Sequence, residues 1–313
     1  LTLARTADNT SRGISIQDNE GTETIRLATS SSDQGLLYLR GPTGGNAIYL
    51  DGNGSSYFNG GNVGIGTTSP DNSAELTILG PVYQDAGSSG AGNVNYGSGS
   101  FAHESGLSNY GGSYSTALGF QSLAFISGNA HRNTAVGYRS MYGDSTGIEG
   151  TDNTAVGASS MLNIKDGQYN VAMGVNALKS VTDGGSNVAT GVNAGRDTTT
   201  GDNNVYIGTS AAKLNTTQGN NVAIGGESMG VAGGHASTAV GYFAMNVASS
   251  QNSVAVGAYA LRTGSNHYNV AVGMSAMTKV SGGAGGVAVG YQSGYHPTGN
   301  YNTWMGYNAG FGT

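Results

Sequence analysis

The sequence has no cysteine, only four prolines and one tryptophan among 313 residues. Without cysteine, neither a disulfide framework nor a thiolate metal site can form, and the redox compartment stays open. No apolar run approaches the ~20 residues that a membrane-spanning helix needs. These absences exclude a disulfide-stapled fold and predict that this segment does not insert into a membrane.

Charge is also scarce. Charged residues make up 10% of the chain, less than half of the usual ~25%, and the formal net charge is −6. A negative chain is a poor partner for nucleic acid or an anionic membrane surface. Low charge combined with 56 glycines would suggest disorder, but a strict internal repeat argues for a rigid structure instead.

One short phrase recurs twelve times from about Ser115 onward, and its cleanest copy is Asn269-Val270-Ala271-Val272-Gly273. The copies are 16 to 20 residues apart when each is anchored on its glycine. A nearly fixed period over many copies is the signature of a solenoid in which each repeat forms one coil. The twelve repeat glycines are Gly119, Gly137, Gly157, Gly174, Gly191, Gly208, Gly225, Gly241, Gly257, Gly273, Gly290 and Gly306.

Positions around each repeat glycine are constrained, and they are numbered from that glycine. Position −1 is apolar in eleven copies, which predicts strand side chains that point into a narrow core. Position −2 is alanine in ten copies and, by alternation, is predicted to face outward against a neighbouring chain. Position −4 is asparagine in eight copies, which predicts a column of stacked amides at a turn. Ser or Ala at +3 and frequent Leu or Met at +4 predict a second short strand with an inward side chain.

The period sets the size of the coil. A coil of about 16–17 residues allows two strands of roughly five residues and two turns, at ~3.3 Å per strand residue. The repeat glycine is expected at a bend or a close backbone contact, because only Gly adopts positive φ without steric cost. We predict an all-β rod of about twelve stacked coils, roughly 55–60 Å long. Two or three apolar side chains per coil are too few to offset the ordering entropy, so we expect lateral association, most simply a homotrimer.

These residues resemble a known repeat. Asn252-Ser253-Val254-Ala255-Val256-Gly257 is similar to the NSVAIG-type repeat of YadA-type trimeric autotransporter adhesin heads, which are left-handed parallel β-rolls built as trimers. The same kind of phrase, often written N-T-A-[VI]-G-x-x-[AS]-[LM], occurs in phage tail fibres and related virion appendages. The resemblance covers roughly residues 115–313 and implies a homotrimeric parallel β-roll of about twelve coils. Adhesin heads repeat at a slightly shorter interval, so longer loops are expected here.

Residues 1–80 contain short apolar-alternating runs separated by turn formers, a pattern typical of an all-β segment. None of these runs would bury a core alone, so we expect an intertwined shaft or attachment segment. The phrase Gly61-Asn62-Val63-Gly64-Ile65-Gly66-Thr67-Thr68-Ser69-Pro70 resembles one found in phage tail-fibre proteins, commonly upstream of a C-terminal intramolecular chaperone. It favours a virion fibre. The runs are Ile14–Ile16, Thr24–Leu27, Leu36–Leu39, Ala47–Leu50, Val63–Ile65 and Leu76–Leu79.

Residues 81–114 are rich in Gly, Ser and Asn, which suits either a flexible linker or degenerate coils that cap the roll. We favour degenerate coils, because terminal repeats are usually atypical. The last repeat has no polar cap, and an open β-end is a pairing hazard. We therefore expect that the native polypeptide continued beyond Thr313 into a trimerising chaperone; an intact native mass ending at Thr313 would contradict this.

The pattern does not support enzymatic chemistry. Tailspikes that cleave polysaccharide use paired carboxylates ~5–9.5 Å apart, whereas the acidic residues here are scattered. Asp144, Glu149 and Asp152 fall in the longest repeat, where a solvated loop explains them better. The five histidines form no His-x-His pair, and no nucleophile elbow or phosphate loop stands in a strand-to-helix context. We predict no enzyme activity, no cofactor and no bound metal.

Aromatic residues are better candidates for recognition. Exposed Tyr and Trp bury a large area at little entropic cost and stack on sugars. Four candidates lie in the C-terminal coils and two in the longest loop, which runs from Tyr142 to Asp152. The alternative for Trp304 and Tyr307 is that they fill space in the last coils. The receptor-binding candidates are Tyr295, Tyr301, Trp304, Tyr307, Tyr142 and Asp144.

These observations predict a structural and receptor-binding fibre of a bacteriophage virion, located outside the cell. Its expected partners are two further copies of the chain, other tail or baseplate proteins, and a host surface glycan or outer-membrane protein, with no nucleic acid. Three weak sites would act together on the bacterial surface. The alternatives are the head of a bacterial trimeric autotransporter adhesin and, with less support, a polysaccharide-degrading tailspike. An ice-binding rod would need an unbroken Thr array, which Thr134, Thr154, Thr238 and Thr303 do not form.

Overall fold

The computed structural model describes residues 114–313 except 127–129, 144–146, 231–233, 249, 265–266, 297 and 313, together with nine short strands within residues 3–96. The described residues form strands and turns without a helix, which confirms the all-β class. Accordingly, no helix in this part of the chain is long and apolar enough to cross a membrane. The chain divides into two units, residues 1–83 and 84–313, and each is described by itself.

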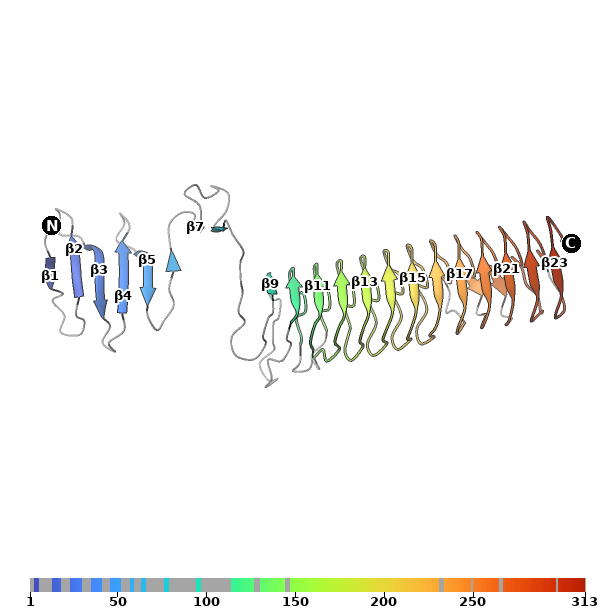
Figure 1. Cartoon of the computed structure of the whole chain (residues 1–313), viewed down its shortest axis with the longest axis horizontal. Coiled ribbons are helices and arrows are strands. Elements are labelled where there is room, and N and C mark those ends of the chain that lie inside the picture. The colour runs from blue at the N-terminus through green and yellow to red at the C-terminus, as the bar shows by residue number, and fades with distance from the viewer. Residues whose placement is uncertain are drawn as a thin grey trace. The chain divides into compact units, whose positions relative to one another are not determined.

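The first unit contains a six-stranded antiparallel sheet in which each strand pairs with the next along the chain (Figure 1). A separate parallel pair follows it. Each of the six predicted runs contributes to one of these strands, while the intertwining of chains stays a prediction. The sheet consists of β1 (Leu3–Arg5), β2 (Gly13–Gln17), β3 (Glu23–Thr29), β4 (Gly35–Arg40), β5 (Asn46–Asp51) and β6 (Tyr57–Phe58), and the pair is β7 (Val63–Ile65) with β8 (Leu76–Ile78).

The second unit is a parallel β-solenoid, as the repeat predicted. Figure 1 shows its strands side by side in chain order, and one strand precedes each repeat glycine. Consecutive strands pair in register, so Thr134, Ala135 and Val136 lie opposite Thr154, Ala155 and Val156. The thirteen-stranded sheet comprises β9 (Val94–Tyr96), β10 (Thr116–Leu118), β11 (Thr134–Val136), β12 (Thr154–Val156), β13 (Val171–Met173), β14 (Val188–Thr190), β15 (Val205–Ile207), β16 (Val222–Ile224), β17 (Thr238–Val240), β19 (Val254–Val256), β21 (Val270–Val272), β22 (Val287–Val289) and β23 (Thr303–Met305).

Strand β9 extends the solenoid upstream of the first repeat. It pairs in parallel with β10, Val94 opposite Thr116 and Tyr96 opposite Leu118. This pairing gives the segment 81–114 one strand of solenoid character. Apart from Tyr114, the rest of that segment lies outside the described residues, and so does the predicted choice between a linker and degenerate coils.

The predicted facing of the strand residues is wrong. Alanine at −2 points into the solenoid, where Ala135, Ala172 and Ala239 are fully buried. Position −1 points outward instead, and Met173 is 47% exposed. The interior is narrow: Leu or Met at +4 and residues such as Ile164 at +7 fill it from the far side. In most coils this leaves room for only a methyl group at position −2 of the strand, which explains why alanine is found there.

The second strand of each coil is also mostly absent among the described residues. After the glycine the chain turns, with +2 and +4 in the left-handed region, as at Asn176 (φ 57°) and Leu178 (φ 46°). Only β18 (Val247–Ala248) and β20 (Thr263–Gly264) form a short second pair. The inward side chain at +4 is confirmed, since Leu178 is fully buried.

The repeat glycines occupy the predicted close backbone contact. Their φ angles run from 121° to 137°, a region that side chains disfavour. A Cβ atom on Gly157 would lie 2.6 Å from the carbonyl oxygen of Gly174 in the next coil. The glycines therefore stack directly, and no larger residue fits between two coils at this position.

Candidate functional site

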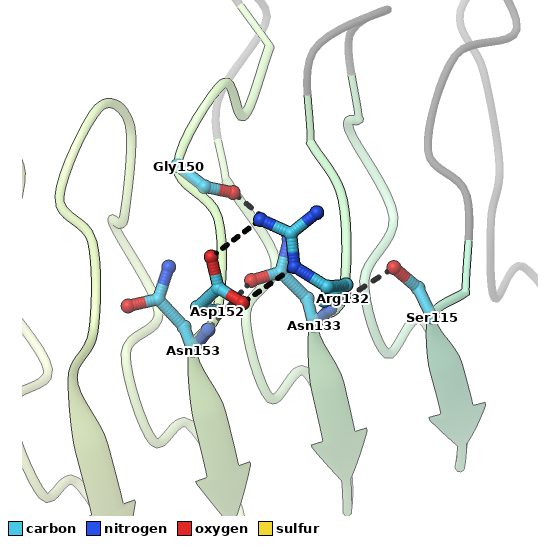
Figure 2. Close-up of polar contacts among 6 residues, drawn as sticks. All are labelled: Ser115, Arg132, Asn133, Gly150, Asp152 and Asn153. Atoms are coloured by element: carbon cyan, nitrogen blue, oxygen red, sulfur yellow. Dashed lines mark hydrogen bonds and ion pairs between the residues drawn. The ribbon is translucent and has the colours of Figure 1, made fainter.

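The asparagines at position −4 stack in a column, as predicted, and the structure shows that this column is buried inside the solenoid. The Asn153 backbone N–H donates to Oδ1 of Asn133 at 3.0 Å, and Nδ2 of Asn133 donates to the Gly150 carbonyl at 2.8 Å (Figure 2). The first repeat has serine here, and the Asn133 N–H donates to Oγ of Ser115 at 3.0 Å. From Asn133 to Asn269 the amide oxygen of each asparagine in the column accepts a backbone N–H of the next coil, whereas Asn302 bonds within its own turn. The column is therefore structural and offers no open site.

The exposed position −5 borders this column. Arg132 and Asp152 form a bidentate ion pair across adjacent coils, at 2.6 and 2.7 Å (Figure 2). The hydrogen bond from Arg132 lowers the pKa of the Asp152 carboxyl, and the same bond raises the pKa of Arg132. The Arg132 side chain is 55% exposed, so the pair contributes little to stability. It explains Asp152 as a surface partner of arginine.

The outer face of the thirteen-stranded sheet is mostly aliphatic: of the 24 residues at positions −3 and −1 of the twelve repeats, 18 are Val, Ile, Leu or Met and six are Thr. Positions −3 and −1 alternate with the buried −2 alanines and therefore share this face. Ile207 is 40% exposed and Val289 37%. We define the apolar face as the −3 and −1 residues of β10–β17, β19 and β21–β23. It lies along every repeat coil.

The predicted C-terminal aromatic residues separate into different environments. Trp304 stands at −2 in β23 and packs partly buried against the interior, so it fills space in the last coil. Tyr307 and Tyr301 are 75% and 82% exposed. Tyr307 stacks on Tyr291 with ring centroids 5.2 Å apart.

Two predicted residues occupy the same coil position although they are far apart in sequence. Tyr142 and Tyr295 both stand at +5, where each ring meets a cation. The Arg139 guanidinium carbon lies 4.5 Å from the Tyr142 ring centroid, and Lys279 Nζ lies 5.6 Å from that of Tyr295. Asp144 lies outside the described residues.

Sequence reasoning missed one deeply buried aromatic residue. Tyr206 replaces alanine at −2 in β15, and its hydroxyl accepts a hydrogen bond from Nδ2 of Asn215. Burial raises the pKa of Tyr206 above its usual range. A Cβ atom on Gly195, at +4 of the preceding coil, would overlap the Tyr206 ring. The signal was available, because this coil and the one before it lack Leu or Met at +4.

The described residues contain no group of three or more His, Asp or Glu side chains that could hold a metal ion. Their exposed faces offer two binding surfaces: the mostly aliphatic sheet face, and the corner after the glycine where cations meet aromatic rings. No protein-family model, curated protein or solved structure matches the chain.

Proposed function

We propose that the chain is a structural and receptor-binding part of a bacteriophage tail fibre, in which three copies associate along the solenoid. The observation that carries the proposal is the apolar face, which runs over all twelve repeat coils with side chains such as Met173 and Ile207 in solvent. Monomeric proteins rarely leave so long an apolar surface uncovered. Association about an axis along the solenoid would cover the same face on each copy.

Further support comes from the coil construction and the sequence. Backbone pairing in one direction over thirteen strands suits a stiff spacer that carries contact sites at a distance from the virion. The phrase at residues 61–70 favours a virion fibre over an autotransporter. Three copies would present each contact site three times, so weak binding to a bacterial surface glycan or outer-membrane protein would gain avidity.

The first test is the mass of the native assembly, measured by native mass spectrometry. We expect the mass of three chains. Ile207→Arg, which places a charge in the apolar face, should abolish this assembly. Asn203→Arg is the matched control and should leave the assembly intact. Asn203 lies in the same coil as Ile207, at position −5, where another coil already has an arginine, Arg132. A stable wild-type monomer, or an Ile207→Arg variant that still forms trimers, would overturn the proposed assembly.

A second test addresses attachment. The labelled protein should bind saturably to cells of a susceptible bacterium. Release of reducing ends from the surface polysaccharide would instead favour the tailspike alternative. Co-fractionation of the full-length native protein with bacterial outer membranes would favour the adhesin.

A further inference from the structure

The charges of the solenoid are segregated between two corners of the coil. Of its eight basic residues, six stand at +2, +5 or +6, the corner that follows the repeat glycine. Five of the seven described acidic residues stand at −8 to −5, the corner before the strand. Buried residues at +7 and −4 separate the corners along the chain. We define the basic edge as Arg139, Lys179, Arg196, Lys213, Arg262 and Lys279.

Three of these cations form a ladder on consecutive coils. Lys179, Arg196 and Lys213 are each 17 residues apart, at the same +5 position. The backbone confirms the stacking, since Ser180 N–H donates to the Arg196 carbonyl at 3.0 Å and Asp197 N–H to the Lys213 carbonyl at 3.0 Å. Coils ~4.8 Å apart place like charges close enough to repel each other.

Intramolecular pairing neutralises only the middle rung of the ladder. Arg196 forms a bidentate pair with Asp197, at 2.6 Å for both contacts. Neither Lys179 nor Lys213 has an ion pair with any residue that the structure describes. The paired Arg196 is therefore flanked by one unpaired lysine on each side, Lys179 and Lys213. Such a row of cations suits the binding of an anionic chain.

Aromatic rings support the cations at both ends of the basic edge. Besides Arg139 on Tyr142 and Lys279 on Tyr295, the Arg262 guanidinium lies 5.7 Å from the Phe243 ring centroid and 5.5 Å from that of Tyr259. The Phe243 and Tyr259 rings stack at 5.8 Å with an interplanar angle of 7°. Such contacts hold a cation in place and lower the entropic cost of binding an anion.

We propose that the basic edge binds a linear acidic polysaccharide that lies along the coils. From the coil of Arg139 to that of Lys279 the edge spans roughly 38 Å at ~4.8 Å per coil. Its cations are one coil or more apart, which suits a sugar chain with sparse charges rather than duplex DNA with one charge per ~1.7 Å. Tyr142 and Tyr295 add half-buried rings on which sugar faces can pack.

The biological meaning of this site rests on the proposed role in surface attachment, whereas the binding itself can be tested alone. The probes are carboxymethyl-dextran, unmodified dextran and inorganic polyphosphate, with affinity measured by calorimetry on the native assembly in 50 mM salt. We expect binding of carboxymethyl-dextran that weakens steeply with salt, and none of dextran. Lys179→Gln/Lys213→Gln should weaken it about tenfold or more.

Three single variants sharpen the test. Lys165→Gln removes one exposed lysine at +8, outside the basic edge, and should leave affinity unchanged, whereas Lys213→Gln should weaken binding. Leucine is compatible with the +5 position, since Leu162 occupies it in another coil. Tyr295→Leu should therefore weaken the binding of carboxymethyl-dextran and leave the binding of polyphosphate, if there is any, unchanged. Equal effects of Lys165→Gln and Lys213→Gln, no binding of carboxymethyl-dextran, or polyphosphate binding alone would each overturn the proposal. If the Lys179→Gln/Lys213→Gln variant still forms trimers and binds cells as well as the wild type does, this site would be overturned while the proposed function would stand.

Discussion

The repeat glycine meets two separate demands at the residue scale. Its φ near 130° disfavours any side chain, and its Cα faces the carbonyl group of the next repeat glycine. These demands can be separated experimentally, because Gly306 has the same backbone conformation (φ 121°) but no atom within 4 Å of a Cβ placed on it.

We predict that Gly174→Ala destabilises the protein far more than Gly306→Ala. At Gly174 the added methyl carbon would lie 2.6 Å from the Gly191 carbonyl oxygen, so strain and steric overlap combine to roughly 3 kcal/mol or more. At Gly306 only the backbone strain of about 1–2 kcal/mol applies. Thermal unfolding of both variants measures the difference. Equal losses would mean that the stacking contact does not matter.

At the scale of the coil, a large side chain at −2 in one coil is compensated by a glycine at +4 in the coil before it. Tyr206 occupies the space that Leu or Met at +4 fills elsewhere, and Gly195 in the preceding coil makes room for it. Trp304 repeats the arrangement, since Cβ atoms on Gly294 and Gly310, both at +4, would overlap or crowd its ring. The alanine at −2 and the large residue at +4 are thus two halves of one packing unit.

This exchange predicts a strong coupling between two residues in adjacent coils. Tyr206→Ala should cost about 3–5 kcal/mol through the cavity that it leaves, and Gly195→Leu should cost about 1–3 kcal/mol through overpacking. The double variant restores the common Ala and Leu pattern, and Leu178 already adopts the required positive φ at +4. A double-mutant cycle in denaturant should give a favourable coupling of at least ~2 kcal/mol. Additive losses would show that the two side chains do not share a space.

The same packing unit shows which features of the coil can be predicted from the repeat and which cannot. The period predicted the solenoid, and asparagine at −4 predicted the column of stacked amides, because both follow from repetition alone; the burial of that column was not predicted. Alternation along a strand separates −1 from −2 but does not say which side is interior, and both positions are apolar. Tyr206 and Trp304 contained the missing information: an aromatic residue at −2 that coincides with glycine at +4 indicates that both face one confined space. The basic edge was not predicted, because its six cations are spread over three positions of the coil and no single position repeats a charge in most copies.

For the whole molecule, equivalent hydrogen bonds between coils make most coils interchangeable. The same hydrogen bond recurs from coil to coil: the Oδ1 atom of the asparagine at −4 accepts the backbone N–H of the residue at −4 in the next coil, at 2.9–3.0 Å. It is made by Asn153, Asn170, Asn187 and Asn204. We predict that deletion of the 17 residues from Val171 to Asn187 preserves the fold, because Asn170 then precedes Val188 in the usual phase. The thermal midpoint should stay within a few degrees of the wild type. Deletion of Val171–Ser180 alone breaks the phase and should unfold the adjoining coils; similar midpoints for both deletions would contradict this account.

The in-register glycine and asparagine columns also have a consequence for how such a gene can change. Duplication or loss of one repeat keeps the reading frame and alters the reach of the protein by one fixed step. The apolar face and the basic edge are lengthened or shortened with it, without redesign of either surface. Reach and number of contacts can therefore be adjusted by recombination, while the side chains that recognise a target vary independently at the corners of each coil.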